Sequence, residues 1–131
     1  MNLFLDNDLA PRHARAIDAL EGEHGNTVVH LREKYPANTP DVDWMTALAK
    51  EGSWVVITAD YRISKNPHEL QAWKEAGLIV FFLRKSWLSI GFWDQAWQLI
   101  KQWPRIPSVA SGARPGQGFL VPLRGTSFDT V

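Results

Sequence analysis

The 131-residue sequence contains no cysteine, and this absence narrows the chemistry available to the protein. Disulfide bonds, thiolate zinc sites and cysteine nucleophiles are excluded, and the composition is compatible with a reducing cytoplasm. The chain also lacks an excess of charge of either sign, since 14 basic side chains balance 14 acidic ones. Without a basic field over the whole molecule, any contact with nucleic acid must be local.

Long apolar runs are missing as well. No stretch approaches the ~20 apolar residues that cross a bilayer. The opening MNLFLDNDL lacks the basic and apolar regions of a signal peptide. We therefore expect a cytoplasmic protein with no membrane partner, and the length favours one domain that buries a core of its own.

Short apolar runs alternate with helical patterns along the first hundred residues. The runs predict strands at residues 2–6, 27–31, 54–58 and 78–83. Helical spacing, proline positions and glycine stops predict helices at about residues 11–21, 40–51, 66–76 and 92–103. This alternation predicts an α/β fold, a single three-layer domain whose mostly parallel central sheet is flanked by helices.

The composition changes after Pro104. We assign residues 1–104 to the α/β domain and residues 105–131 to a Gly/Pro-rich C-terminal tail. The segment FLVPL can add one strand, and Pro122 predicts that it lies at the edge of the sheet, because proline cannot donate to a central ladder. The tail holds three arginines and one aspartate, so it is locally basic and could contact RNA.

Acidic side chains are predicted to meet at one edge of this sheet. Asp6 and Asp8 end the first strand, and Asp60 lies just beyond the third. Asp41 and Asp43 begin the helix that follows the second strand, so they face the same edge. In an open α/β sheet, functional groups gather beyond the carboxyl ends of the strands, especially where successive connections leave in opposite directions.

Clustered carboxylates repel one another and raise one another's pKa values. A hard divalent cation removes this repulsion, and Mg²⁺ takes oxygen ligands while keeping several waters. Such ions can activate a water and stabilise both oxygens of an in-line phosphoryl displacement. The five aspartates are therefore predicted to bind Mg²⁺ or Mn²⁺, although each one taken alone also fits a helix cap, a helix start or a turn.

Four basic residues lie close to these aspartates in the sequence, namely Arg12, Arg15, Arg62 and Lys65. Charge-assisted hydrogen bonds from them could hold the phosphate groups of a substrate. The alternative is that they neutralise the acidic cluster or remain solvated.

Aromatic side chains are abundant near the end of the helical region. Trp93, Trp97 and Ile100 fall at helical spacing, which favours burial in the core or in a subunit contact over base stacking. A contact of this kind would suit a homodimer or a protein partner. Trp44, in the acidic helix, is expected to pack into the core.

Two segments, FLDNDLAPRHARAI and VVHLREKYPANTPDVDWMTALAKEGSWVVITADYRI, resemble PIN-like nuclease domains, and most closely those of VapC-type toxins. The shared pattern is an aspartate closing the first strand, an acidic residue opening a helix some thirty-five residues on, and an apolar run ending in TxD. Here these positions are Asp6, Asp41 and Asp60, and the resemblance spans about residues 1–88.

The resemblance implies a metal-dependent endoribonuclease, the toxin of a toxin–antitoxin pair, that cleaves RNA with carboxylate-bound Mg²⁺ or Mn²⁺ and is blocked by an antitoxin. The three aspartates of the pattern would be catalytic. Asp43 could take the place of Asp41, and Asp8 would be a supporting group. The further acidic residue that many PIN nucleases carry would be Glu69 or Asp94.

Other functions remain open. The DND sequence after the first strand also opens haloacid-dehalogenase-type phosphatases, but no acidic pair follows Lys85 here. A receiver domain that accepts a phosphoryl group could use Asp60 and Lys85. A PIN-like binding module without catalysis is the third alternative.

Overall fold

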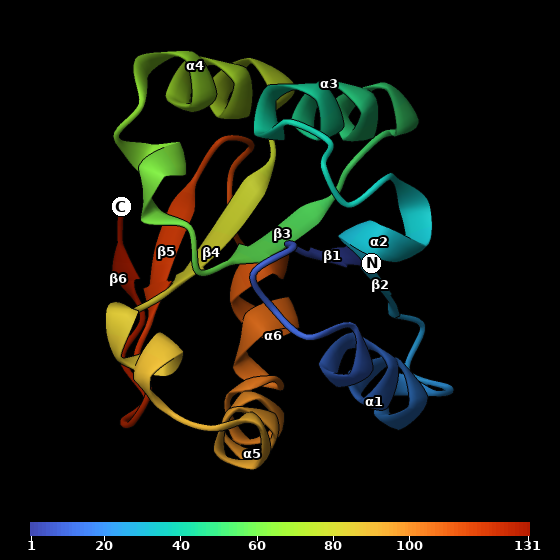
Figure 1. Ribbon diagram of the computed structural model, residues 1–131, viewed down its shortest axis with the longest axis vertical. Coiled ribbons are helices and arrows are strands. Elements are labelled where there is room, and N and C mark those ends of the chain that lie inside the picture. The colour runs from blue at the N-terminus through green and yellow to red at the C-terminus, as the bar shows by residue number, and fades with distance from the viewer.

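The computed structural model describes residues 1–131 and contains one six-stranded sheet (Figure 1). The strands are β1 (Asn2–Leu5), β2 (Thr27–His30), β3 (Val55–Thr58), β4 (Ile79–Leu83), β5 (Gly118–Val121) and β6 (Asp129–Thr130). Their order is β2-β1-β3-β4-β5-β6, and all pairs are parallel except β5 with β6. Because β1 lies between β2 and β3, the chain winds away from it in both directions, which creates a switch point between β1 and β3.

Helices cover both faces of the sheet. They are α1 (Pro11–Glu21), α2 (Leu31–Lys34), α3 (Asp41–Glu51), α4 (Pro67–Ala76), α5 (Phe92–Gln102) and α6 (Arg105–Ser111), with 3-10 helices η1 (Tyr61–Ser64) and η2 (Lys85–Ser89). In Figure 1, α3 and α4 lie above the sheet, and α1, α5 and α6 lie below it. The predicted three-layer α/β architecture with a mostly parallel sheet is confirmed. No helix is long and apolar enough to pass through a lipid bilayer.

Alternating side chains of the strands enter two separate cores. Leu3 and Leu5 pack on the side of α1, α5 and α6, whereas Phe4, between them, packs against Trp44 of α3 on the other side. The Phe4 and Trp44 rings are 4.9 Å apart, and Trp44 is buried as expected. Burial on both faces explains why the strands read as continuous apolar runs rather than as alternating patterns.

The prediction of a C-terminal tail with at most one edge strand is wrong. Residues 105–131 contain α6, β5 and β6, and β5 is internal because it pairs with β4 on one side and β6 on the other. Pro122 comes directly after Val121, the last residue of β5, so it removes no hydrogen bond from the ladder. The indole of Trp87 donates to the Val121 carbonyl at 3.2 Å, which ties this segment to η2.

The helix that carries Asp41 begins slightly differently from the prediction. The prediction placed Pro40 inside the helix, whereas Pro40 is the N-cap residue that precedes α3. The Thr39 hydroxyl donates to the Pro36 carbonyl at 2.7 Å, within the loop before the helix. Asp41 is therefore the first helical residue, at the end of α3 where the helix dipole favours negative charge.

Candidate functional site

A hollow of about 440 Å³ lies beyond the carboxyl ends of β1 and β3. It is at the switch point of the sheet, where α/β folds place their ligands. The lining residues are Asp6, Asn7, Asp8, Leu31, Thr39, Asp41, Ala59, Asp60, Arg62 and Leu88. Four of the five aspartates predicted from the sequence are thus brought together.

Asp6 is the most buried of these acids, with 4% of the residue exposed. Its backbone N–H donates to Ile57 of β3 at 2.9 Å, which continues the β1–β3 ladder by one residue. Its carboxylate accepts the Asn7 N–H at 2.6 Å and the Thr58 hydroxyl at 2.8 Å. Burial, together with the charge of Asp8, raises the pKa of Asp6 to about 7 in spite of these two hydrogen bonds.

Thr58 connects the two strands that carry the acids. Its fully buried hydroxyl donates to Asp6 and accepts the backbone N–H of Asp60 at 2.9 Å. Replacing the hydroxyl would leave a carboxylate oxygen and an N–H without partners. The role of Thr58 was not predicted, although a polar residue that ends an otherwise apolar strand is a signal in the sequence.

Asp8 lies at the open side of the hollow. The residue is exposed as a whole, and one carboxylate oxygen accepts the Ala59 N–H at 3.4 Å. Loss of water around the carboxylate is the main cause that raises the pKa of Asp8 to about 6, and the charge of Asp60 adds to it. Asp6 and Asp8 are therefore acids whose charged forms are both disfavoured at this site.

His30, at the end of β2, holds the loop that carries these two acids. Its ring Nδ1 accepts the Arg32 N–H at 3.0 Å, so Nε2 carries the proton and donates to the Leu9 carbonyl at 2.6 Å. His30 is completely buried, and burial lowers its pKa. It acts as a neutral structural link rather than as a ligand of the hollow.

Asp41 and Asp43 have different surroundings although they are two residues apart. Asp41 lines the hollow, and its carboxylate accepts the indole N–H of Trp44 at 3.0 Å. Burial raises the pKa of Asp41, and the charge of Asp60 contributes in the same direction. Asp43 is exposed and does not line the hollow, so the prediction that it joins the cluster is not supported by the geometry.

Asp60 forms an ion pair with Arg62. The guanidinium Nε and Nη2 each lie 2.9 Å from a carboxylate oxygen of Asp60, and the Arg62 N–H donates to the same carboxylate at 3.0 Å. These contacts lower the pKa of Asp60 and raise that of Arg62. The Arg62 side chain is 83% exposed, so solvent reaches the pair and its guanidinium is free to move.

The other three basic candidates are not at the hollow. Arg12, Arg15 and Lys65 are exposed, and none of them lines it or forms an ion pair. Of the four predicted phosphate ligands, the fold therefore brings only Arg62 to the carboxylates, where it neutralises Asp60.

Glu69, in the first turn of α4, is an acidic residue from later in the chain whose pKa is affected by the charges of the cluster. Burial raises its pKa first, and the charges of Asp41 and Asp60 raise it further. Its Oε2 is buried without a hydrogen-bond partner. Asp94 instead lines a separate hollow on α5, so Glu69 is the stronger of the two candidates from the sequence.

The family model described as a PIN like domain matches residues 1–85. The chain belongs to the PIN-like domain family. PIN-like domains are commonly nucleases. The matched residues include all that line the hollow except Leu88. No curated protein and no solved structure matches the chain.

The donor set of this PIN-like domain suits Mg²⁺ or Mn²⁺, because every acidic group at the hollow offers hard carboxylate oxygens. In the present arrangement, no three acidic or histidine side chains are close enough together to hold one ion. Both oxygens of Asp60 are occupied by Arg62. Mg²⁺ commonly uses one or two carboxylates and several waters, so Asp6 and Asp8 fit as its first ligands.

Proposed function

We propose that this PIN-like domain is a metal-dependent endoribonuclease. The observation that carries the proposal is the convergence of Asp6, Asp8, Asp41 and Asp60 on one hollow at the switch point of the sheet. The pKa values of three of these acids are raised, which indicates that the groups of the protein do not fully compensate the negative charge of the carboxylates. A divalent cation is the ligand that would compensate it.

A cation bound there would supply an activated water and would neutralise charge on a phosphodiester. The protein's own groups position the acids for this task. Thr58 fixes the Asp6 carboxylate, and the indole of Trp44 fixes that of Asp41. Arg62 is exposed enough to leave Asp60 and donate to a phosphate oxygen, which would free Asp60 to act as a ligand.

The choice of RNA as substrate rests on the resemblance of the sequence to VapC-type domains. The same resemblance supports a toxin role with a cognate protein antitoxin. Growth arrest on expression of the wild type, absent for Asp6→Asn, is the expected sign of that role. The toxin role and the cytoplasmic location stay predictions.

The phosphatase and receiver alternatives have less support at this site. Both need a lysine beside the acids, but Lys85 does not line the hollow. It lies instead in a neighbouring hollow beside Tyr61 and Arg84. Asp60, the phosphoryl acceptor in a receiver, is paired with Arg62 through both carboxylate oxygens.

The test is cleavage of a mixed RNA sample in Mg²⁺ or Mn²⁺ by the wild type, Asp6→Asn and Asp60→Asn. We expect discrete cleavage products from the wild type, and none from either variant or in EDTA. Asp43→Asn is the matched control, because it removes the same charge from the start of α3 but lies outside the hollow. It should cleave as the wild type does.

Calorimetric titration with Mn²⁺ in the absence of RNA separates binding from catalysis. Cleavage that survives EDTA would refute the metal-dependent mechanism. Loss of cleavage in Asp43→Asn, with Asp6→Asn still active, would refute this assignment of the site. Cleavage of single-stranded DNA but not RNA would overturn the substrate class.

A further inference from the structure

Helix α5 carries an apolar stripe on its outer side. Trp93, Trp97 and Ile100 follow one another at helical spacing and are 80%, 52% and 43% exposed. Of the two alternatives predicted for them, burial in the core is wrong, because Leu99 and Trp103 form the inner side of the helix, and burial in a contact with another chain stays a prediction. Large apolar side chains gathered on one exposed face mark a surface that contacts another molecule.

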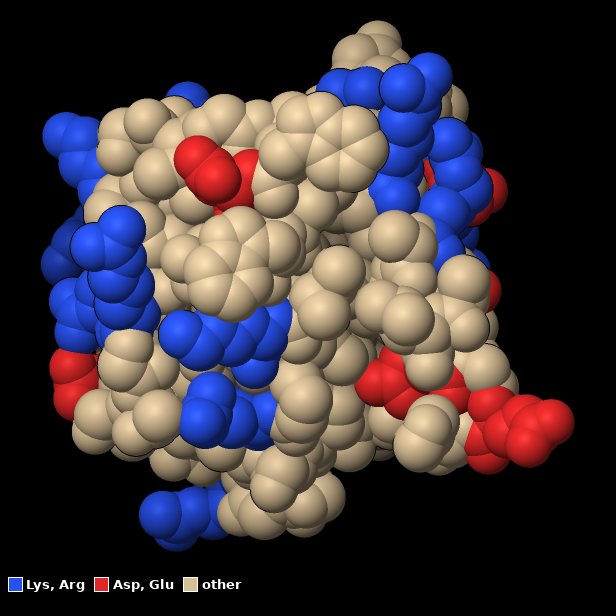
Figure 2. All heavy atoms as spheres, turned by 90° about the horizontal axis from the view of Figure 1, so that it is seen from below, with Lys and Arg blue, Asp and Glu red and all other residues tan.

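Figure 2 shows the face of the molecule that carries α5 and α1. Uncharged atoms make up most of the surface from the upper centre to the bottom, with one acidic group among them near the top, and Lys and Arg side chains lie at the left, just left of the centre and at the upper right. Acidic side chains gather at the lower right, on the side of α1. A partner of this face therefore meets an apolar centre with negative charge at one end.

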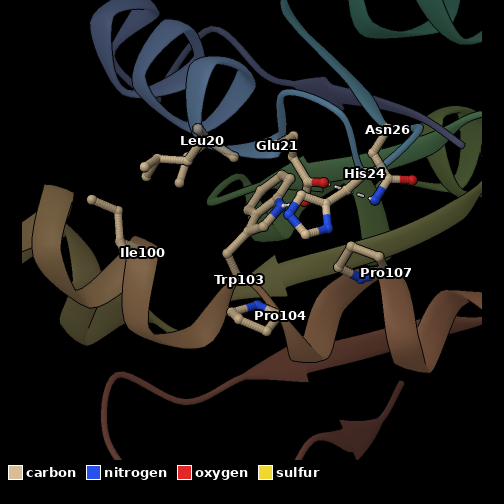
Figure 3. Close-up of a pocket in the computed structure, with 9 residues that line it drawn as sticks. Leu20, Glu21, His24, Asn26, Ile100, Trp103, Pro104 and Pro107 are labelled. Carbon is tan, nitrogen blue, oxygen red and sulfur yellow. Dashed lines mark hydrogen bonds between the residues drawn. The ribbon is translucent and has the colours of Figure 1, made fainter.

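A pocket of about 510 Å³ opens at that end, between α1, the loop that follows it, and the junction of α5 with α6. In Figure 3, Leu20 of α1 and Ile100 of α5 lie opposite each other, with Trp103 between the two helices. Pro104 and Pro107 add apolar surface. Ile100 belongs both to this pocket and to the stripe on α5, so the two surfaces are continuous.

Glu21 supplies the charge of the pocket. The residue is only 8% exposed, and its carboxylate accepts the Trp103 indole N–H at 2.6 Å and the Asn26 side-chain N–H at 3.0 Å (Figure 3). Both donors are neutral, and none of the three ion pairs in the chain involves Glu21. Buried carboxylates are normally paired with a cation, and this one retains free lone-pair sites.

The walls of the pocket decide which cation fits. A bare metal ion needs several oxygen ligands, and only one carboxylate is present. The side chains of arginine and lysine combine a cationic end with an apolar stem, which matches a carboxylate beside the apolar side chains of α1 and α5, and His24 and Asn26 complete the lining. The continuous stripe on α5 requires an occupant longer than one side chain.

We propose that a helical segment of a partner protein packs along the α5 stripe and inserts an arginine or lysine side chain into this pocket, where it pairs with Glu21. Tryptophan and arginine are among the residues that are enriched in binding hot spots. The proposal does not depend on the chemistry of the carboxylate hollow.

The pocket lies away from that hollow. Helix α1 starts beside the hollow, soon after Asp8, and ends at Glu21, which is about 16 Å further for its 11 residues. The two cavities share no lining residue. The pocket that would take the basic side chain is therefore separate from the carboxylates.

The test uses helical peptides whose leucines have the spacing of Trp93, Trp97 and Ile100, with one arginine a turn before or after them. Matched peptides carry citrulline, the neutral isostere of arginine. Binding is followed by the NMR signal of the Trp103 indole N–H, which donates to Glu21. We expect one arginine peptide to bind at least about tenfold more tightly than its citrulline counterpart.

Glu21→Gln should abolish this difference, whereas Glu23→Gln, at an exposed residue outside the pocket, should preserve it. The arginine-to-citrulline comparison on the wild type decides the question even if Glu21→Gln folds poorly. Equal affinity for the two peptides, or no saturable shift with either arginine peptide, would overturn the proposal. Self-association of the free chain that Trp97→Ser abolishes would assign the stripe to a second copy and overturn it as well.

Discussion

Asp6→Asn is expected to stabilise the metal-free protein at neutral and alkaline pH. The folded state raises the pKa of Asp6 from 3.8 to about 7, so it binds this proton more tightly than the unfolded state does. The free energy of unfolding therefore falls as the pH rises from about 4 to 7, and it loses nothing more from this group above that range. At 1.36 kcal/mol for each pKa unit, the cost is about 4 kcal/mol.

Asparagine keeps the shape of the side chain and removes the charge. Asparagine also weakens the hydrogen bonds from Asn7 and Thr58, which lowers the free energy of unfolding by about 1 kcal/mol and so offsets part of the increase. We expect urea unfolding in EDTA at pH 8 to show a variant about 3 kcal/mol more stable than the wild type. The difference should shrink toward zero near pH 4. Asp43→Asn, which removes an exposed charge, should follow the wild type at every pH.

The effect of added metal on stability tests the same carboxylate in a second way. A divalent cation favours the charged form of Asp6, so excess Mn²⁺ at pH 8 should stabilise the wild type and leave Asp6→Asn nearly unchanged. If the free energies of unfolding of the two proteins changed in parallel between pH 4 and 8, the inference that the charge of Asp6 is uncompensated in the folded protein would be refuted. A gain from Mn²⁺ in Asp6→Asn as large as in the wild type would refute its role as a ligand.

Three further substitutions test separate parts of the structure. Thr58→Val leaves two polar groups of the hollow without partners and should cost about 1–3 kcal/mol in urea unfolding, whereas Thr46→Val, on the exposed side of α3, should cost much less. Gly118→Ala places a Cβ 2.6 Å from a buried indole ring and should lower the stability by about 1–3 kcal/mol; a neutral result would contradict the packing of β5. Arg62→Gln releases the carboxylate of Asp60, which should raise its pKa and tighten Mn²⁺ binding by calorimetry. Unchanged or weaker Mn²⁺ binding would show that the ion pair does not compete with the metal.

The sequence alone determined the architecture and most of the acidic site. Apolar runs at regular intervals specify strands buried on both faces, and helices between them require parallel pairing. Carboxyl ends of parallel strands share one edge, so Asp6 and Asp60 could be placed together before any coordinates. The prediction for Asp41 rests on the same rule, because Asp41 opens α3 in the connection between β2 and β3.

Tertiary structure decided the features that depend on contacts between distant segments. Asp41 and Asp43 are equivalent in sequence pattern, and only the packing of α3 turns one toward the hollow and the other toward solvent. The pairing of β5 with two neighbours was hidden, because Pro122 is harmless one residue beyond the ladder. Helical spacing showed that Trp93 and Trp97 share a face of α5, but not which face meets the sheet. Periodicity is a local property of the chain, whereas the choice of partner across the core is not.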